Sequence, residues 1–481
     1  MSRGLRTLRS LGDRIADGRP VLTRNQMTGL ATRVLALTSS ATSSVSVTHT
    51  TRVVTRMANG QVLSSDDGDE LQIMVMSYFG GRQGIYVTIN QLDDTVLQAM
   101  VTRCETLARQ MIGADEELRH VPQAPDTFVP VKLWHDETVR AMQTTRGTVI
   151  PELLNAVERE RLNAAGFLGF MARAEAWINK EGISAFSEET DSEVTVTART
   201  PDGKSSGWDG RAARNWNTVS YADVATRAID FAKRGAGAQA LEPGRRTAIL
   251  SPSAVAQVIR CLAEEFRADE SDDGMTGFSR PPGRNKIGQQ VFDARISMCS
   301  DPADPDGGYR PYFDTGFGTP AMSWVENGVL KNLAYTPNYA AVRGKSYASL
   351  PWSLRVSGGP ASVEQMIAQC NDGIYVNRFS NVNLIDLKSG MTTGVTRDGC
   401  FFVKNGKIDR PIKNFRFIDS PFFFLNRIEA LGHTVRAAFG YTLPNAQDRG
   451  LGGVTDWPRQ PIIVPPMMVR DFNFSALVDA V

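Results

Sequence analysis

The stretch TAILSPSAVAQVIRCLAEEFRADE (residues 247–270) decides how the second half of the chain folds. It begins as a short β-branched strand, breaks at Ser251 and Pro252, and continues with apolar residues at helical spacing. The apolar residues on one face of the expected helix are Val255, Val258, Ile259, Leu262 and Phe266. A strand that runs into a helix often carries chemistry, because the helix N-terminus presents unpaired N–H groups. The sequence therefore predicts a strand-helix element over residues 247–266.

The polar side chains of this expected helix include Arg260, Cys261 and Glu265. Taken by themselves, they match no known set of metal ligands or catalytic groups. Cys261 could be a nucleophile, because the neighbouring arginine would lower the pKa of its thiol. A cysteine among Val, Ile and Leu is more often a small buried residue. The residues alone leave both interpretations of Cys261 open.

The composition bounds the class of protein and its partners. With 481 residues the chain is too long for one ordinary hydrophobic core, which predicts two or three domains. Hydrophobic residues make up 42% and charged residues 22%, as in globular proteins that fold in water. A formal net charge of +1 gives no electrostatic case for nucleic acid or a membrane surface. We therefore expect no direct nucleic-acid binding and no membrane partner.

The cysteines and histidines give no sign of a disulfide framework or a local zinc site. The five cysteines are odd in number, scattered, and never in a C-x-x-C pair. They are Cys104, Cys261, Cys299, Cys370 and Cys400. None of the four histidines has the i, i+4 spacing that builds a zinc site on a helix. We expect a protein of the reducing cytoplasm.

The pattern of apolar residues and turns predicts an α+β fold. The N-terminal module combines antiparallel strands with helices, and a β-rich C-terminal domain contains the strand-helix element. The expected regions are a leader (1–21), an N-terminal α+β domain (22–115), a middle region (116–240) and the C-terminal domain (241–481). Asn-Gly pairs, the strongest short-range signal for a hairpin, occur at residues 59–60, 327–328 and 405–406.

Two further stretches are candidate binding sites. Residues 198–205 match a relaxed phosphate-loop pattern, but a phosphate loop must lead into a helix, and here a turn between two strands is predicted. Residues 268–285 are acidic and then rich in Pro, Gly and Arg, which predicts a mobile loop. Arg280, Arg284 and Lys286 form a basic cluster in this loop and directly after it. Such a cluster could hold an anion or the carboxylate of a peptide, with a solvated loop as the alternative.

Several stretches, in consistent order along most of the chain, resemble the TldD/PmbA family. Its members are known as modulators of DNA gyrase and as a zinc metallopeptidase system. The stretches are RMANG (56–60), GGRQG (80–84), IGQQVFD (287–293), VENGVLKN (325–332), GIYV (373–376) and NGKI (405–408). So many matches in order are far more specific than any single motif.

The resemblance implies that the helix of the strand-helix element corresponds to the zinc-binding helix of related chains. A TldD-type subunit of this family carries H-E-x-x-x-H on this helix, plus a distal Cys, to hold zinc. By that resemblance, Arg260 stands at the first His, Cys261 at the Glu, and Glu265 at the second His. The distal Cys corresponds to residues 441–460, which contain no cysteine. The chain is therefore similar to the TldE/PmbA type, which lacks the zinc motif.

This resemblance implies a non-catalytic subunit of a TldD/TldE-type heterodimeric zinc metallopeptidase complex. The complex would cleave small or unfolded peptides, among them peptide natural-product precursors, with the peptide held as an added strand on a sheet edge. We expect no cofactor in this chain and zinc in a TldD-like sister subunit. Two alternatives are a homodimeric peptide-binding protein without protease activity and a self-sufficient, metal-independent hydrolase.

Overall fold

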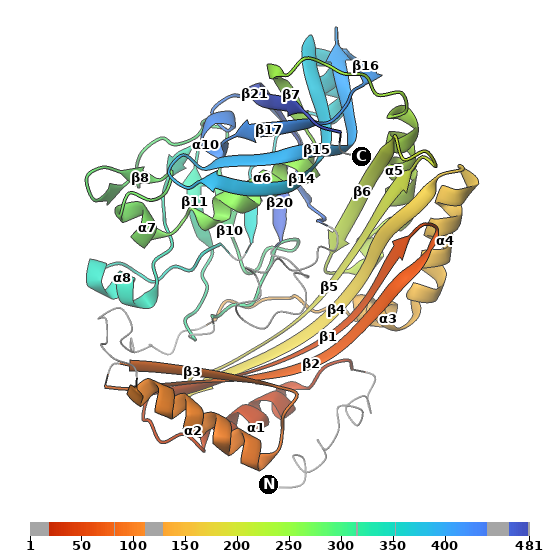
Figure 1. The fold of residues 1–481 in the computed structure, drawn as a ribbon. Helices are drawn as coiled ribbons and strands as arrows, with labels where there is room; N and C mark the ends of the chain where they lie inside the picture. Colours follow the sequence, from red (N-terminus) through yellow and green to blue (C-terminus); the bar gives the residue numbers. More distant parts are fainter. Residues whose placement is uncertain are drawn as a thin grey trace.

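The computed structural model describes residues 19–80, 82–110, 128–313, 316–351, 353–439 and 461–479. Over these residues the chain folds into two halves that pack against each other (Figure 1). Both halves combine helices with sheets, which confirms the expected α+β class. The expected leader lies almost wholly outside the described residues, and the 441–460 region compared with the distal cysteine lies entirely outside them.

The first half is built on an antiparallel sheet with the strand order β3-β2-β1-β4-β5-β6. The strands are β1 (Ser43–Ala58), β2 (Gln61–Phe79), β3 (Arg82–Ile89), β4 (Asn163–Asn179), β5 (Ser184–Arg199) and β6 (Ser206–Ala213). Because β1 pairs with β4 along most of its length, the sheet continues across the boundary expected near residue 115. The regions 22–115 and 116–240 therefore share one sheet and one hydrophobic core.

Five of the described helices contribute to that core and cover one face of the sheet. They are α1 (Arg24–Leu35), α2 (Asp94–Gln110), α3 (Asp136–Thr144), α4 (Arg146–Arg159) and α5 (Tyr221–Arg234), on the convex side of the curved strands in Figure 1. None of the described helices has the length and apolar character needed to cross a membrane. The opposite, concave face is turned toward the second half.

The second half contains strands whose pairings close on themselves. The circuit β14-β7-β21-β17-β15-β14 consists of β7 (Gly244–Leu250), β14 (Asp372–Asp386), β15 (Met391–Lys404), β17 (Phe415–Asp419) and β21 (Met467–Leu477). Aromatic side chains pack together among these strands. The ring of Phe417 lies 4.3 Å from that of Phe379 and 5.5 Å from that of Phe472, between centroids. Outside the circuit, β16 (Lys407–Pro411) pairs with β15 and β18 (Ile428–Leu431) pairs with β21.

A smaller sheet lies beside this circuit, with the order β12-β11-β10-β13-β20-β19. Its strands are β10 (Met298–Ser300), β11 (Met322–Glu326), β12 (Val329–Leu330), β13 (Leu354–Val356), β19 (Val435–Arg436) and β20 (Ile462–Val464). Helix α6 (Pro252–Glu264) packs against both β14 and β20, so it lies in the core that the two sheets share. Because β7 ends at Leu250 and α6 begins at Pro252, the predicted strand-helix element is confirmed.

The three Asn-Gly pairs form hairpin turns, as predicted. They connect β1 to β2, β11 to β12 and β15 to β16, with positive φ at both residues of each pair. Residues 268–285, by contrast, are more ordered than the expected loop. They contain the short helix α7 (Ala268–Asp272) and a hairpin of β8 (Ser279–Arg280) and β9 (Arg284–Asn285).

Buried ion pairs join the concave face of the first sheet to the second half. Asp191 of β5 lies 2.6 Å from a guanidinium nitrogen of Arg436, and their side chains are only 5% and 8% exposed. Glu175 of β4 pairs with Arg310 in the same way. A buried charge is costly unless it has an opposite partner, so these pairs fix how the two halves dock.

Replacing Arg436 with alanine should lower the free energy of unfolding by about 3 to 5 kcal/mol, because Asp191 would remain buried without its partner. Urea unfolding measures the change. A matched control is Lys233→Ala, which removes one member of the exposed pair with Glu160 and should cost less than about 1 kcal/mol. Equal losses in the two variants would contradict this account of the docking.

Candidate functional site

The start of α6 is fixed by a cap and by its strand. The Ser251 hydroxyl accepts a hydrogen bond from the Ala254 N–H at 3.2 Å and donates to the Asn377 carbonyl. Strand β7 pairs with β14 on one side and with β21 on the other, and α6 begins two residues after β7 ends. The element that the sequence singled out is thus firmly positioned, and its function depends on which side chains it presents.

Cys261 lies half-buried on α6 and packs against the hydrophobic core. Its Sγ is 3.7 Å from the Gln257 carbonyl oxygen one turn earlier. Burial raises the pKa of the Cys261 thiol, and the charge of Arg260 offsets this only in part. The thiol is therefore protonated at neutral pH, whereas a nucleophilic cysteine must be a thiolate. This geometry favours the interpretation of Cys261 as a packing residue.

Glu265 is fully buried at the C-terminal end of α6. One carboxyl oxygen accepts a hydrogen bond from the Gly277 N–H at 2.9 Å, and the other has no partner among the described residues. Burial raises the pKa of Glu265 to about 7, and the negative charges of Glu270 and Asp386 act in the same direction. The side chain thus joins the end of the helix to the segment that precedes β8.

The residues at the aligned positions do not fit zinc. A structural zinc ion takes four ligands from Cys, His, Asp or Glu, and a catalytic zinc ion takes three. Within the described ranges, no group of three or more such side chains converges anywhere. Arg260, at the position of the first His, is a permanent cation that would repel the metal. Glu265 already accepts a structural hydrogen bond.

The basic cluster is only partly assembled in the structure. Arg280 and Arg284 are exposed and lie directly opposite each other in the β8–β9 hairpin. Lys286 instead turns inward, where its Nζ donates to the Gly277 carbonyl at 2.7 Å, and burial lowers its pKa. The structure therefore places two of the three predicted contact residues on the surface and uses the third within the fold.

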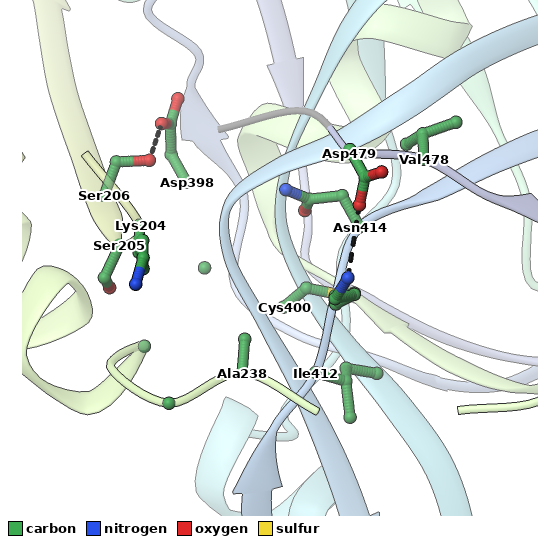
Figure 2. A pocket seen from close by; sticks show the side chains of 14 residues that line it. Lys204, Ser205, Ser206, Ala238, Asp398, Cys400, Ile412, Asn414, Val478 and Asp479 are labelled. Carbon is green, nitrogen blue, oxygen red and sulfur yellow. Dashed lines mark hydrogen bonds and ion pairs between the residues drawn. The ribbon is translucent and has the colours of Figure 1, made fainter. Parts of the chain in front are cut away.

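A cavity of about 330 Å³ lies where the two halves meet (Figure 2). Its polar lining includes Lys204, Ser205, Ser206, Asp398, Lys413 and Asp479. The lining groups largely bond one another: Ser206 donates to Asp398 at 2.7 Å, and Lys413 lies 3.2 Å from Asp479. Sequence reasoning missed this cavity because its residues come from segments far apart in the chain. The turn predicted at residues 198–205 contributes Lys204 and Ser205 to the lining, although it does not have the helix that a phosphate loop requires.

Comparison with known proteins gives this arrangement a family. Residues 243–476 match the model of the PmbA/TldA metallopeptidase C-terminal domain. The chain is 26% identical over 250 residues to an uncharacterized protein of Methanocaldococcus jannaschii, covering 50% of this chain and 57% of that protein. It is 28% identical over 134 residues to the metalloprotease TldD homolog of Buchnera aphidicola, covering 25% of this chain and 27% of that protein. The chain thus spans little more than half the length of one curated relative and about a quarter of the other.

Solved structures share the fold over nearly their whole length. A protein of Thermotoga maritima, described as a candidate modulator of a DNA gyrase, superposes with a TM-score of 0.78 at 16% identity, covering 93% of this chain and 99% of its own. TldE from Thermococcus kodakarensis gives a TM-score of 0.78 at 13% identity, with 93% and 99% covered. These likenesses show that the chain has the fold of TldE and of proteins described as candidate modulators of DNA gyrase. Residues 243–476 belong to the PmbA/TldA metallopeptidase C-terminal domain family, and this match together with the TldD homolog supports the TldD/PmbA family for the chain.

The raised pKa of Glu265 predicts a specific dependence of stability on pH. In the unfolded chain this carboxyl loses its proton near pH 4.5, but in the folded chain it keeps the proton up to about pH 7. Its contribution to stability is therefore present below about pH 4.5 and is lost as the pH rises to about 7. Glu265→Gln, which stays neutral, should be more stable than the wild type by up to about 3 kcal/mol at about pH 8.

Urea unfolding at several pH values measures this difference. The control is Glu264→Gln, which changes the exposed neighbour on the same helix and should leave the pH profile unchanged. If the Glu265→Gln profile runs parallel to that of the wild type between about pH 5 and about pH 8, then the carboxyl does not titrate in this range.

Proposed function

We propose that this chain is the non-catalytic subunit of a TldD/TldE-type heterodimeric zinc metallopeptidase complex that cleaves small or unfolded peptides. The observation that carries the proposal is the state of the aligned positions on α6. Arg260 is cationic, Cys261 packs against the core, and Glu265 is hydrogen-bonded within the fold. Zinc would then be held by a TldD-like sister subunit, while this chain helps to enclose the peptide.

The substrate class and the compartment are part of the same proposal. Family membership supports a peptide as substrate, and natural-product precursor peptides are among the candidates. All five cysteines are free, which is in line with a reducing cytoplasm. The likeness to a protein described as a candidate modulator of DNA gyrase is a likeness of fold. It is not used to propose DNA binding, because the net charge of +1 gives no electrostatic support for nucleic acid as a partner.

Co-expression with a sister chain that carries H-E-x-x-x-H and a distal Cys tests the proposal. We expect native mass spectrometry to show a heterodimer, metal analysis to find zinc in the sister chain, and the complex to cleave an unstructured peptide. Each chain alone serves as the control. If this chain alone binds stoichiometric zinc and cleaves the peptide, the proposal is wrong. A stable homodimer that binds peptide and ignores the sister chain would support the peptide-binding alternative.

Cys261→Ala separates the proposal from the metal-independent hydrolase. Because burial keeps the Cys261 thiol protonated, the variant should cleave peptides in the complex within about twofold of the wild-type rate. The measurement is kcat/KM for an unstructured peptide, with Cys299→Ala as a second half-buried thiol for comparison. Loss of cleavage in Cys261→Ala, with Cys299→Ala unaffected, would instead identify Cys261 as a nucleophile.

A further inference from the structure

Strand β3 lies at one end of the sheet of the first half, and its outer side pairs with no described strand (Figure 1). The Asn90 N–H donates to the Leu71 carbonyl at 2.8 Å, and the Leu71 N–H donates to the Asn90 side-chain oxygen at 2.8 Å. Hydrogen-bonded and non-bonded pairs alternate along antiparallel strands, so this pair determines which backbone groups face β2. The N–H and C=O groups that point away from β2 are therefore those of Gln83, Ile85, Val87 and Ile89.

This edge has none of the features that usually protect a free edge. Natural proteins block such edges with charged side chains, prolines or β-bulges, because unpaired N–H and C=O groups pair readily with another chain. Residues 83–89 (QGIYVTI) contain no charge and no proline, and the register between β2 and β3 is unbroken. The stretch of β2 that β3 does not cover carries Asp66, Asp67 and Asp69 instead. The same sheet therefore protects one stretch of its edge and leaves the other open.

Apolar side chains form one continuous patch beside this edge, which we call the β3 patch. It consists of Ile85, Val87 and Ile89 of β3, which are 45%, 37% and 40% exposed, together with Met74 and Met76 of β2. Alternate residues of a strand share one face, and a side chain at Gly84 would collide with α2, so the patch lies on the concave side of the sheet. Ile85 lies directly opposite Met76, and Val87 directly opposite Met74, which places these side chains about 5 Å apart between Cβ atoms.

The charges beside β3 on the side of α2 are basic. Arg82 begins the strand, and Arg103 of α2 lies over the Tyr86 ring and donates to its hydroxyl at 3.1 Å. Neither arginine forms an ion pair with a described residue. The nearby carboxylates have other partners: Glu105 pairs with Arg109, Asp94 with Arg33, Glu70 with Arg52 and Asp69 with His49, while Asp93 accepts from the Thr95 N–H.

The backbone pattern and the charges together define what fits this edge. Outward N–H and C=O groups on every second residue match those of another β-strand, so the occupant is extended. Side chains of an added strand alternate between its two faces, so one set meets the β3 patch and the other lies on the side of Arg82 and Arg103. Apolar residues suit the first set, and carboxylates suit the second. An extended peptide with alternating apolar and acidic residues is thus complementary on both faces.

A second copy of this chain fits the edge less well. Pairing β3 with itself, antiparallel about a two-fold axis, aligns the most residues when the axis passes near Tyr86. Because Arg103 lies over that ring, the two copies of Arg103 would approach each other. Like charges brought together across an interface are unfavourable, whereas a carboxylate from a peptide would be attracted.

We propose that the free edge of β3 binds an extended peptide as an added strand, with apolar side chains against the β3 patch and acidic side chains near Arg82 and Arg103. This inference rests on the proposed function, in which the chain helps to enclose a peptide. It adds where the peptide lies on this subunit and which sequences fit.

Fluorescence anisotropy of labelled peptides with the purified full chain tests the site. A peptide of alternating valine and glutamate should bind about tenfold more tightly than one of alternating valine and lysine, and high salt should reduce the difference. Val87→Pro removes an N–H that faces away from β2, so it should weaken binding by about tenfold and preserve the β2–β3 pairing. The matched control is Ser65→Pro, which removes an outward N–H from the protected stretch of β2 and should leave Kd within about twofold.

Two further measurements separate binding from folding. Methylation of every second peptide amide should weaken binding about tenfold for one alternate set and leave it unchanged for the other, because only one set faces β3. This comparison uses the wild-type chain, so it stands even if Val87→Pro fails to fold. Arg103→Glu should abolish the preference for the acidic peptide, while Arg159→Glu, an exposed arginine at the end of α4, should keep it.

The remaining outcomes distinguish this site from the proposed function. If Val87→Pro and both methylated peptides bind as the wild type and the unmodified peptide do, the edge is not the site, and the proposed function stands as long as the complex cleaves peptides. If neither peptide binds the wild type, the inference is also wrong. If the wild type forms a dimer that Val87→Pro dissociates, a second copy occupies the edge. If the edge binds peptide as expected but the complex cleaves none, the proposed function fails and the site stands.

Discussion

The docking of the two halves depends on buried carboxylates on the concave face of the first sheet. Each of them needs an opposite charge or a hydrogen-bond donor from the second half, because a buried charge without a partner is costly. Asp191 and Glu193 are nearly inaccessible to water, and each is satisfied from the second half, by Arg436 and by the Phe439 N–H respectively. Separating the halves would expose these groups to water, but shifting one half would leave a buried charge without a partner. These contacts therefore fix the position of the second half, which contains α6, relative to the sheet of the first half.

Local features of this fold could be predicted from the sequence, because a few neighbouring residues determine them. The strand-helix element follows from its apolar spacing and from Ser251, and the three hairpins follow from Asn-Gly pairs that adopt positive φ easily. The shared sheet of the first half could not be predicted, because β1 pairs with β4 across more than a hundred residues. The cavity between the halves was missed for the same reason.

In the candidate site, too, some features follow from nearby residues and others depend on segments that are distant in the sequence. Its position on α6 came from a resemblance, but the state of each side chain depends on segments that the helix meets only in the folded chain. The burial of Glu265 and its bond to Gly277 require the approach of the β8 segment. Likewise, the basic cluster looked uniform in the sequence, yet Lys286 turns inward because the Gly277 carbonyl lies within its reach.

The hydrogen bond between Glu265 and Gly277 also limits which substitutions α6 can accept. In this chain, the bond between the Glu265 side chain and the Gly277 backbone amide holds the C-terminal end of α6 to the segment before β8. A side chain without an acceptor at this position would leave the buried Gly277 N–H unpaired, and such unpaired groups cost about 1 to 3 kcal/mol. Such a substitution would therefore weaken the fold at this end of the helix.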